Sequence, residues 1–140
     1  MFVPLGFIKE YYRTIIVLIL IAYLSTVSGE EVNKVSWISL PYIDKIGHLL
    51  MYLTLSITFT YEIVKKKHKI PVRKTLIFIV LFAILYGGVM ELIQEFLIKT
   101  RSGDWIDFGF NVAGASLGIP FFLLFRRKEI SLYRNKEFNT

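Results

Sequence analysis

The sequence predicts an all-α fold, an integral membrane bundle of four transmembrane helices with both termini in the cytoplasm. Of the 140 residues, 54% are hydrophobic and only 20% are charged, which is too apolar for an ordinary soluble domain. The apolar residues form four blocks, and the basic residues gather beside alternate ends of these blocks. Because this pattern leaves no room for a second domain, we expect residues 1–140 to form a single membrane domain.

Each apolar block approaches the roughly 20 residues that an α-helix needs to cross a bilayer. The predicted spans cover residues 11–27, 46–64, 76–97 and 108–125. A cleaved leader is the alternative interpretation of the first span, because Lys9 and Arg13 precede a short apolar core and residues 25–29 loosely resemble a cleavage site. Either outcome leaves Gly29 on the far side of the membrane, so the predicted topology is unchanged.

The distribution of lysine and arginine predicts the orientation, since these residues favour the cytoplasmic side of a membrane. Of the 17 basic residues, 13 lie near the two termini and in the loop at residues 65–74, and the remaining four lie on the other side. The first and third loops are therefore predicted to be extracytoplasmic. This topology accounts for the net charge of +6, so we exclude a nucleic-acid partner. The absence of cysteine excludes disulfides, iron–sulfur ligation and a catalytic thiol.

Polar side chains near the extracytoplasmic ends of three spans indicate a shared pocket. A charged side chain costs about 2.5 to 3.5 kcal/mol at the centre of a membrane helix, and an unpartnered polar group facing lipid is also unfavourable. Asp44 and His48 are four residues apart and share one helical face, which Tyr52 continues. The predicted pocket residues are Asp44, Lys45, His48, Tyr52, Glu91, Gln94, Glu95, Arg101, Asp104, Asp107 and Asn111.

These residues resemble the motifs of the VanZ-like membrane proteins. The resemblance follows the order Asp44-Lys45-Ile46-Gly47-His48 with Tyr52, Glu91-Leu92-Ile93-Gln94 with Glu95, Arg101 with Asp104 and Asp107, and Asn111 with Gly114 and Gly118. It implies a small four-helix protein of the bacterial plasma membrane, in a family named for a member that lowers susceptibility to the glycopeptide teicoplanin. It implies no established reaction.

Two classes of function follow from the pocket and the resemblance. The first is a protein that binds or modulates a cell-envelope component, such as an envelope lipid or a wall precursor, at the extracytoplasmic face; this substrate class comes from the resemblance. The alternative is a membrane enzyme that uses His48 with Glu91 or Asp107 as an acid–base pair on an envelope lipid or its head group. A small proton-coupled transporter is a third class, and it requires oligomerisation because four helices leave little room for a pathway. The sequence assigns no catalytic residue.

We expect no cofactor and no metal, because HExxH-type spacing is absent and the other histidine, His68, lies in the basic loop. An alternative is that a divalent cation is bound by the nitrogen of His48 and the carboxylate oxygens of Glu91 and Asp107. The expected partners are the lipid bilayer and the envelope component, and oligomerisation is compatible with the pattern. Small-residue spacing that allows close helix approach predicts packing roles for Gly87, Gly88, Gly114 and Gly118.

Overall fold

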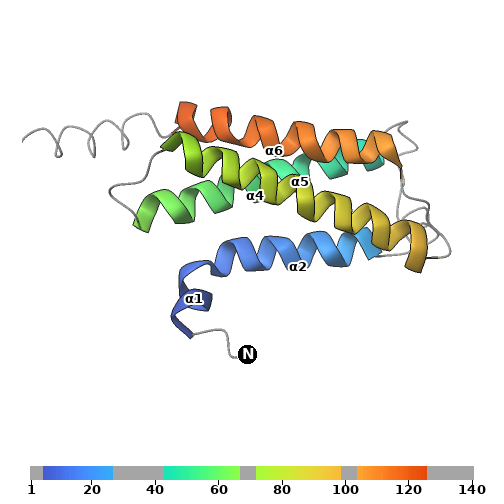
Figure 1. Cartoon of the computed structure of the whole chain (residues 1–140), viewed down its shortest axis with the longest axis horizontal. Helices are drawn as coiled ribbons and strands as arrows, with labels where there is room; N and C mark the ends of the chain where they lie inside the picture. The colour runs from blue at the N-terminus through green and yellow to red at the C-terminus, as the bar shows by residue number, and fades with distance from the viewer. Residues whose placement is uncertain (1–4, 27–42, 67–71, 99–103, 126–140) are drawn as a thin grey trace, which may run out of the picture.

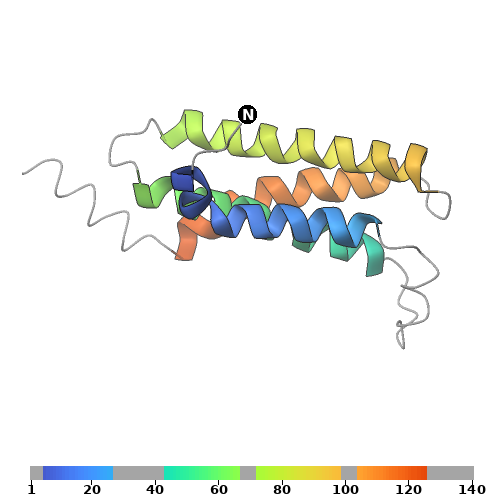
Figure 2. The same cartoon turned by 90° about the horizontal axis from the view of Figure 1, so that it is seen from below.

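The computed structural model describes residues 5–26, 43–66, 72–98 and 104–125, and within these ranges it is all-helical. The helices are α1 (Leu5–Glu10), α2 (Tyr12–Thr26), α4 (Ile43–Lys66), α5 (Val72–Leu97) and α6 (Trp105–Phe125). The four long helices lie beside one another and alternate in direction, while α1 turns away at the start of α2 (Figures 1 and 2). The predicted all-α fold is confirmed for the described residues.

Helices occupy all four predicted apolar segments, and the differences lie mainly at their N-terminal ends. Helix α4 begins at Ile43 instead of residue 46, α5 at Val72 instead of residue 76, and α6 at Trp105 instead of residue 108. Hydropathy locates the end of an apolar run, whereas backbone hydrogen bonding continues through the polar residues beside it. The short helix α1 was not predicted.

Two of the described helices are long and apolar enough to cross a membrane. They are α5, over Leu76–Leu97 with mean hydropathy 2.5, and α6, over Trp105–Leu124 with mean hydropathy 1.4. Helix α2 is apolar but has only 15 residues, and α4 has 24 residues with a lower average hydrophobicity. Length and composition therefore support two of the four predicted spans.

Helices α4 and α6 are in close contact at two glycines of α6. A Cβ atom added at Gly114 would lie 3.0 Å from the backbone nitrogen of Leu53, and nearer still to the carbonyl oxygen of Leu49. A Cβ at Gly118 would lie 2.6 Å from the Cβ of Ser56. The backbone of α6 thus rests against α4 over two successive turns, which a larger residue would prevent.

The two glycines of α5 differ from each other. A Cβ at Gly87 would lie 3.2 Å from Cε1 of Tyr52 and 3.3 Å from the side chain of Asn111, so this position accommodates residues from both neighbouring helices. At Gly88 the nearest atom, in the ring of Phe108, would be 3.6 Å away, an ordinary contact distance. A Cβ atom at Gly87 would thus be tightly packed, whereas a Cβ atom at Gly88 would make an ordinary contact.

Helix α2 is held to the bundle by hydrogen bonds at three levels. At its start, the Glu62 carboxylate of α4 accepts hydrogen bonds from the backbone nitrogens of Arg13 (2.9 Å) and Thr14 (3.2 Å), and from the Thr14 hydroxyl at 2.6 Å. In the middle, the Tyr86 hydroxyl of α5 donates to the Leu18 carbonyl at 2.7 Å. A third bond, from α5 to the carbonyl of Ser25, holds the end of the helix.

Glu62 acts as an N-terminal cap supplied by another helix. The first backbone N–H groups of a helix have no partner within it and carry partial positive charge, so a carboxylate there supplies acceptors and favourable electrostatics. Glu62 is only 4% exposed, and water therefore has little access to replace it. This carboxylate is the main polar link between α2 and α4.

Replacing Glu62 with alanine should lower the free energy of unfolding by roughly 1–3 kcal/mol, because buried donors on α2 would lose their acceptor. The decrease can be measured as a lower Tm of the detergent-solubilised protein. Thr54→Ala is the matched control on α4, because the Thr54 hydroxyl is exposed and donates only to the Leu50 carbonyl of its own helix. Equal Tm values for the two variants would contradict the capping role.

Candidate functional site

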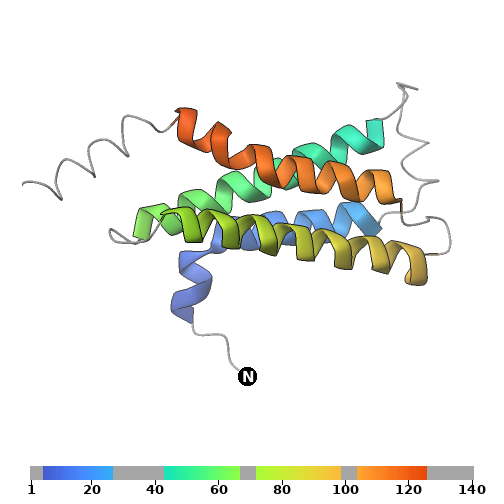
Figure 3. The ribbon, with the colours of Figure 1, turned by 45° about the horizontal axis from the view of Figure 1, so that its top comes forward.

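Helices α4 and α6 begin, and α5 ends, at the same end of the bundle (Figure 3). A cluster of polar side chains lies at this end. We call it the polar-end cluster and define it by side chains from these three helices. Its members are Asp44, Lys45 and His48 of α4, Glu91 of α5, Asp107 and Asn111 of α6, and Asp104 directly before α6.

Lys45 joins the start of α4 to the start of α6. Its Nζ atom lies 2.9 Å from Oδ2 of Asp104 and 2.8 Å from Oδ1 of Asp107. The Lys45 side chain is only 16% exposed, so these ion pairs are screened less than pairs on an open surface. The two carboxylates both favour the charged form of the Lys45 side chain, which is the ordinary form of lysine at neutral pH.

Asp104 has two structural roles at the start of α6. Its Oδ1 accepts a hydrogen bond from the backbone nitrogen of Ile106 at 2.8 Å, the geometry of an N-terminal cap. Its own backbone nitrogen donates to Oε2 of Glu91 at 3.3 Å, which connects this turn to α5. The hydrogen bond from Lys45, followed by the one from Ile106, lowers the pKa of the Asp104 carboxyl group.

Asn111 connects His48 and Glu91 in the interior of the cluster. Its Oδ1 atom is 2.9 Å from Nδ1 of His48, and its Nδ2 atom donates to Oε1 of Glu91 at 3.1 Å. Asn111 is fully buried and His48 is 2% exposed. The carboxylate oxygen requires the amide NH₂ group of Asn111 to face Glu91, so the amide oxygen faces His48 and Nδ1 of His48 is the donor. In the neutral imidazole, the lone pair therefore lies on Nε2.

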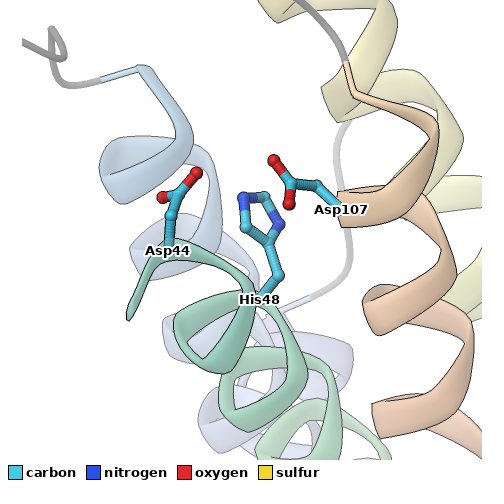
Figure 4. Close-up of side chains that lie close together, drawn as sticks. All are labelled: Asp44, His48 and Asp107. Atoms are coloured by element: carbon cyan, nitrogen blue, oxygen red, sulfur yellow. The ribbon is translucent and has the colours of Figure 1, made fainter. Parts of the chain in front are cut away.

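The side chains of Asp44, His48 and Asp107 lie close together (Figure 4). They adjoin the hydrogen bonds that link His48, Asn111 and Glu91. One carboxylate oxygen or ring nitrogen from each residue lies within 4.8 Å of the others. Asp44 is exposed whereas His48 and Asp107 are buried, so one of the three side chains is accessible from outside the bundle. An arrangement of this kind is suited to hold a cation or to transfer a proton.

Three of the predicted pocket residues that the structure describes, Tyr52, Gln94 and Glu95, are not part of these contacts. Gln94 is buried, but its Nε2 atom donates to the Ser25 carbonyl of α2 at 3.0 Å. Tyr52 is fully buried, and its hydroxyl has no hydrogen-bond partner among the described residues. Glu95 is exposed on α5, and Arg101 lies outside the described residues. The three side chains that converge at this end, Asp44, His48 and Asp107, include Asp44 in place of Glu91, the acid considered from the sequence.

Sequence analysis missed Glu62, which lies at the opposite end of α4. An acid close to Lys65 and Lys66 fits the ordinary pattern of a solvated helix end. Its spacing carried a signal, because Glu62 follows Leu55 by seven residues, or about two helical turns, on the buried face that also holds His48 and Tyr52.

The fold and the cluster together define a helical bundle with a buried polar site at one end. Comparison of the chain with models of known protein families, with curated proteins and with solved structures finds no match. The resemblance to the VanZ-like proteins therefore stays a prediction.

The lowered pKa of Asp104 predicts a pH-dependent contribution to stability. Because the folded pKa lies below the ordinary value of 3.8, the charged carboxylate stabilises the fold above that pH, and the contribution is lost as pH falls through the folded pKa. Asp104→Asn keeps a capping side chain and removes the charge. Its Tm should be below that of the wild type at neutral pH, and the difference should disappear under acidic conditions. A difference that is constant with pH would exclude the ion pair as its cause.

Proposed function

We propose that this chain is a multi-pass protein of the bacterial plasma membrane, with α2, α4, α5 and α6 as its four transmembrane helices. In this proposal both termini are cytoplasmic and the polar-end cluster lies at the extracytoplasmic face. The distribution of basic residues supports this orientation, because 13 of the 17 lie in the segments assigned to the cytoplasmic side.

The side-chain arrangement of α4 supports its assignment as a span. Its polar residues His48, Thr60 and Glu62 are buried at 4% exposure or less, whereas Ile46 and Leu50 are about half exposed, at 49% and 53%. The hydroxyls of its Thr54 and Thr58 donate to carbonyls of the same helix. A helix with apolar side chains outside and polar groups inside is suited to lipid rather than to water.

With this topology, we propose that the polar-end cluster binds or modulates a cell-envelope component, such as an envelope lipid or a wall precursor. The observation that carries the proposal is the convergence of Lys45, His48, Asp107, Asn111 and Glu91 from three helices at one end of an apolar bundle. Side chains held by several hydrogen bonds form a preorganised site, which loses little entropy when it binds a ligand. The resemblance to the VanZ-like proteins supports the choice of ligand class.

The charge of the cluster narrows the ligand chemistry. Its described residues contain four carboxyl groups and one lysine, and that lysine already contacts two of the carboxylates. A ligand group that donates hydrogen bonds or carries positive charge therefore fits the described part of the cluster better than a bare anion.

The proposed topology can be tested by cysteine labelling, since the chain contains no native cysteine. Trp105 is 87% exposed at the start of α6, and Lys65 is exposed near the end of α4. In intact cells, a membrane-impermeant maleimide should label Trp105→Cys, and it should label Lys65→Cys only after permeabilisation. The reverse pattern would overturn the orientation, and labelling of both sites in intact cells would overturn the four-span arrangement.

The proposed function can be tested by drug susceptibility in a bacterial host. Expression of the wild-type chain should lower susceptibility to teicoplanin more than to vancomycin. Asn111→Ala should abolish the effect, because it removes the partner of both His48 and Glu91. Thr54→Ala should retain it, and the amounts of the variants in the membrane should be compared by immunoblot. A wild-type chain with no effect, or full activity of Asn111→Ala, would argue against the proposal.

A further inference from the structure

We infer that Asp44, His48 and Asp107 form a binding site for a divalent transition-metal cation, of which Zn²⁺ is the best match. The inference rests on the geometry and chemistry of these side chains (Figure 4) and is independent of the proposed envelope ligand. It differs from the ligand set considered from the sequence, because Asp44 takes the place of Glu91 beside His48 and Asp107.

The geometry is close to that of a metal site. Asp44 and His48 lie one helical turn apart on α4, and Asp107 faces them from α6. The three ligand atoms lie within 4.8 Å of one another. Metal–ligand distances of about 2.0–2.2 Å require ligand atoms roughly 3–4 Å apart, so small side-chain rotations suffice to close the site.

The hydrogen bonds around His48 prepare its ring for metal binding. Asn111 accepts the Nδ1 proton, and Glu91 fixes the orientation of the Asn111 amide. Histidine ligands in metal sites commonly donate their second ring nitrogen to an oxygen atom in this way, which fixes both the tautomer and the ring orientation. The buried imidazole thus keeps Nε2 as the nitrogen available to a cation.

The electrostatics of the group also favour a cation. Lys45 contacts Oδ1 of Asp107, and in the proposed site the cation is bound through Oδ2 of the same carboxylate. The carboxylates of Asp44 and Asp107 bring two negative charges to the side of the His48 ring, and the Lys45 ammonium brings one positive charge. One imidazole nitrogen with two carboxylate oxygens suits Zn²⁺, whereas Mg²⁺ and Ca²⁺ prefer oxygen ligands alone.

The test is calorimetric titration of the purified, chelator-treated full chain with Zn²⁺, with Mg²⁺ in a parallel titration. The wild type should bind one Zn²⁺ per chain and should gain thermal stability, since a ligand that binds only the folded state raises its Tm. Asp44→Asn and His48→Ala should each lose this binding and the accompanying rise in Tm. Asn111→Ala should weaken it by about 10–100-fold, as expected for a residue that orients a ligand.

His68→Ala is the matched control, because His68 is the other histidine of the chain and lies outside the proposed site. This variant should bind Zn²⁺ as the wild type does. Asp44 is exposed and is replaced by an isosteric amide, so Asp44→Asn remains informative if His48→Ala does not fold. The inference is overturned if the wild type binds no Zn²⁺, if Asp44→Asn binds it unchanged, or if His68→Ala abolishes binding. Heat on Mg²⁺ addition equal to that with Zn²⁺ would overturn the assignment of the ion.

Discussion

The side-chain amide of Asn111 joins three helices, because it contacts His48 of α4 and Glu91 of α5 from its position on α6. Neither partner has much access to water, and a buried acid or imidazole without a hydrogen bond would be costly. The amide reaches both only because α6 lies close against α4. Gly114 and Gly118, on the turns that follow Asn111, permit this approach. Backbone packing at two glycines thus determines where the polar chemistry of the bundle can occur.

The two ends of the bundle satisfy buried acids in different ways. At one end, Asp107 is paired with a lysine, and Glu91 receives hydrogen bonds from an amide and from the backbone of Asp104. At the other end, Glu62 receives hydrogen bonds from the backbone and a hydroxyl of α2. In both cases the partners come from another helix or the turn before it, which is the arrangement expected where solvent cannot supply them. The polar residues therefore determine which helices are neighbours.

Much of the fold and a large part of the cluster could be predicted from the sequence, because both follow from the cost of polar groups in apolar helices. The four apolar segments and the common level of Asp44, His48, Glu91, Asp107 and Asn111 are properties of one-dimensional spacing. The hydrogen-bond partner of each side chain cannot be deduced from this spacing. Adjacent residues on a helix point about 100° apart, so neighbours in the sequence can belong to different environments.

Gln94 and Glu95 illustrate this limit, since the first bonds to α2 and the second is exposed. Glu62 was missed because an acid near Lys65 and Lys66 fits the pattern of a solvated helix end, whereas its burial depends on the position of α2. This last contact has a consequence for biogenesis. The cap of the first long helix is encoded 48 residues downstream of Thr14, so nascent α2 lacks its acceptor until α4 has been synthesised. This capping interaction can therefore form only after α4 has been synthesised and has docked against α2, which makes the order of translation part of how the bundle assembles.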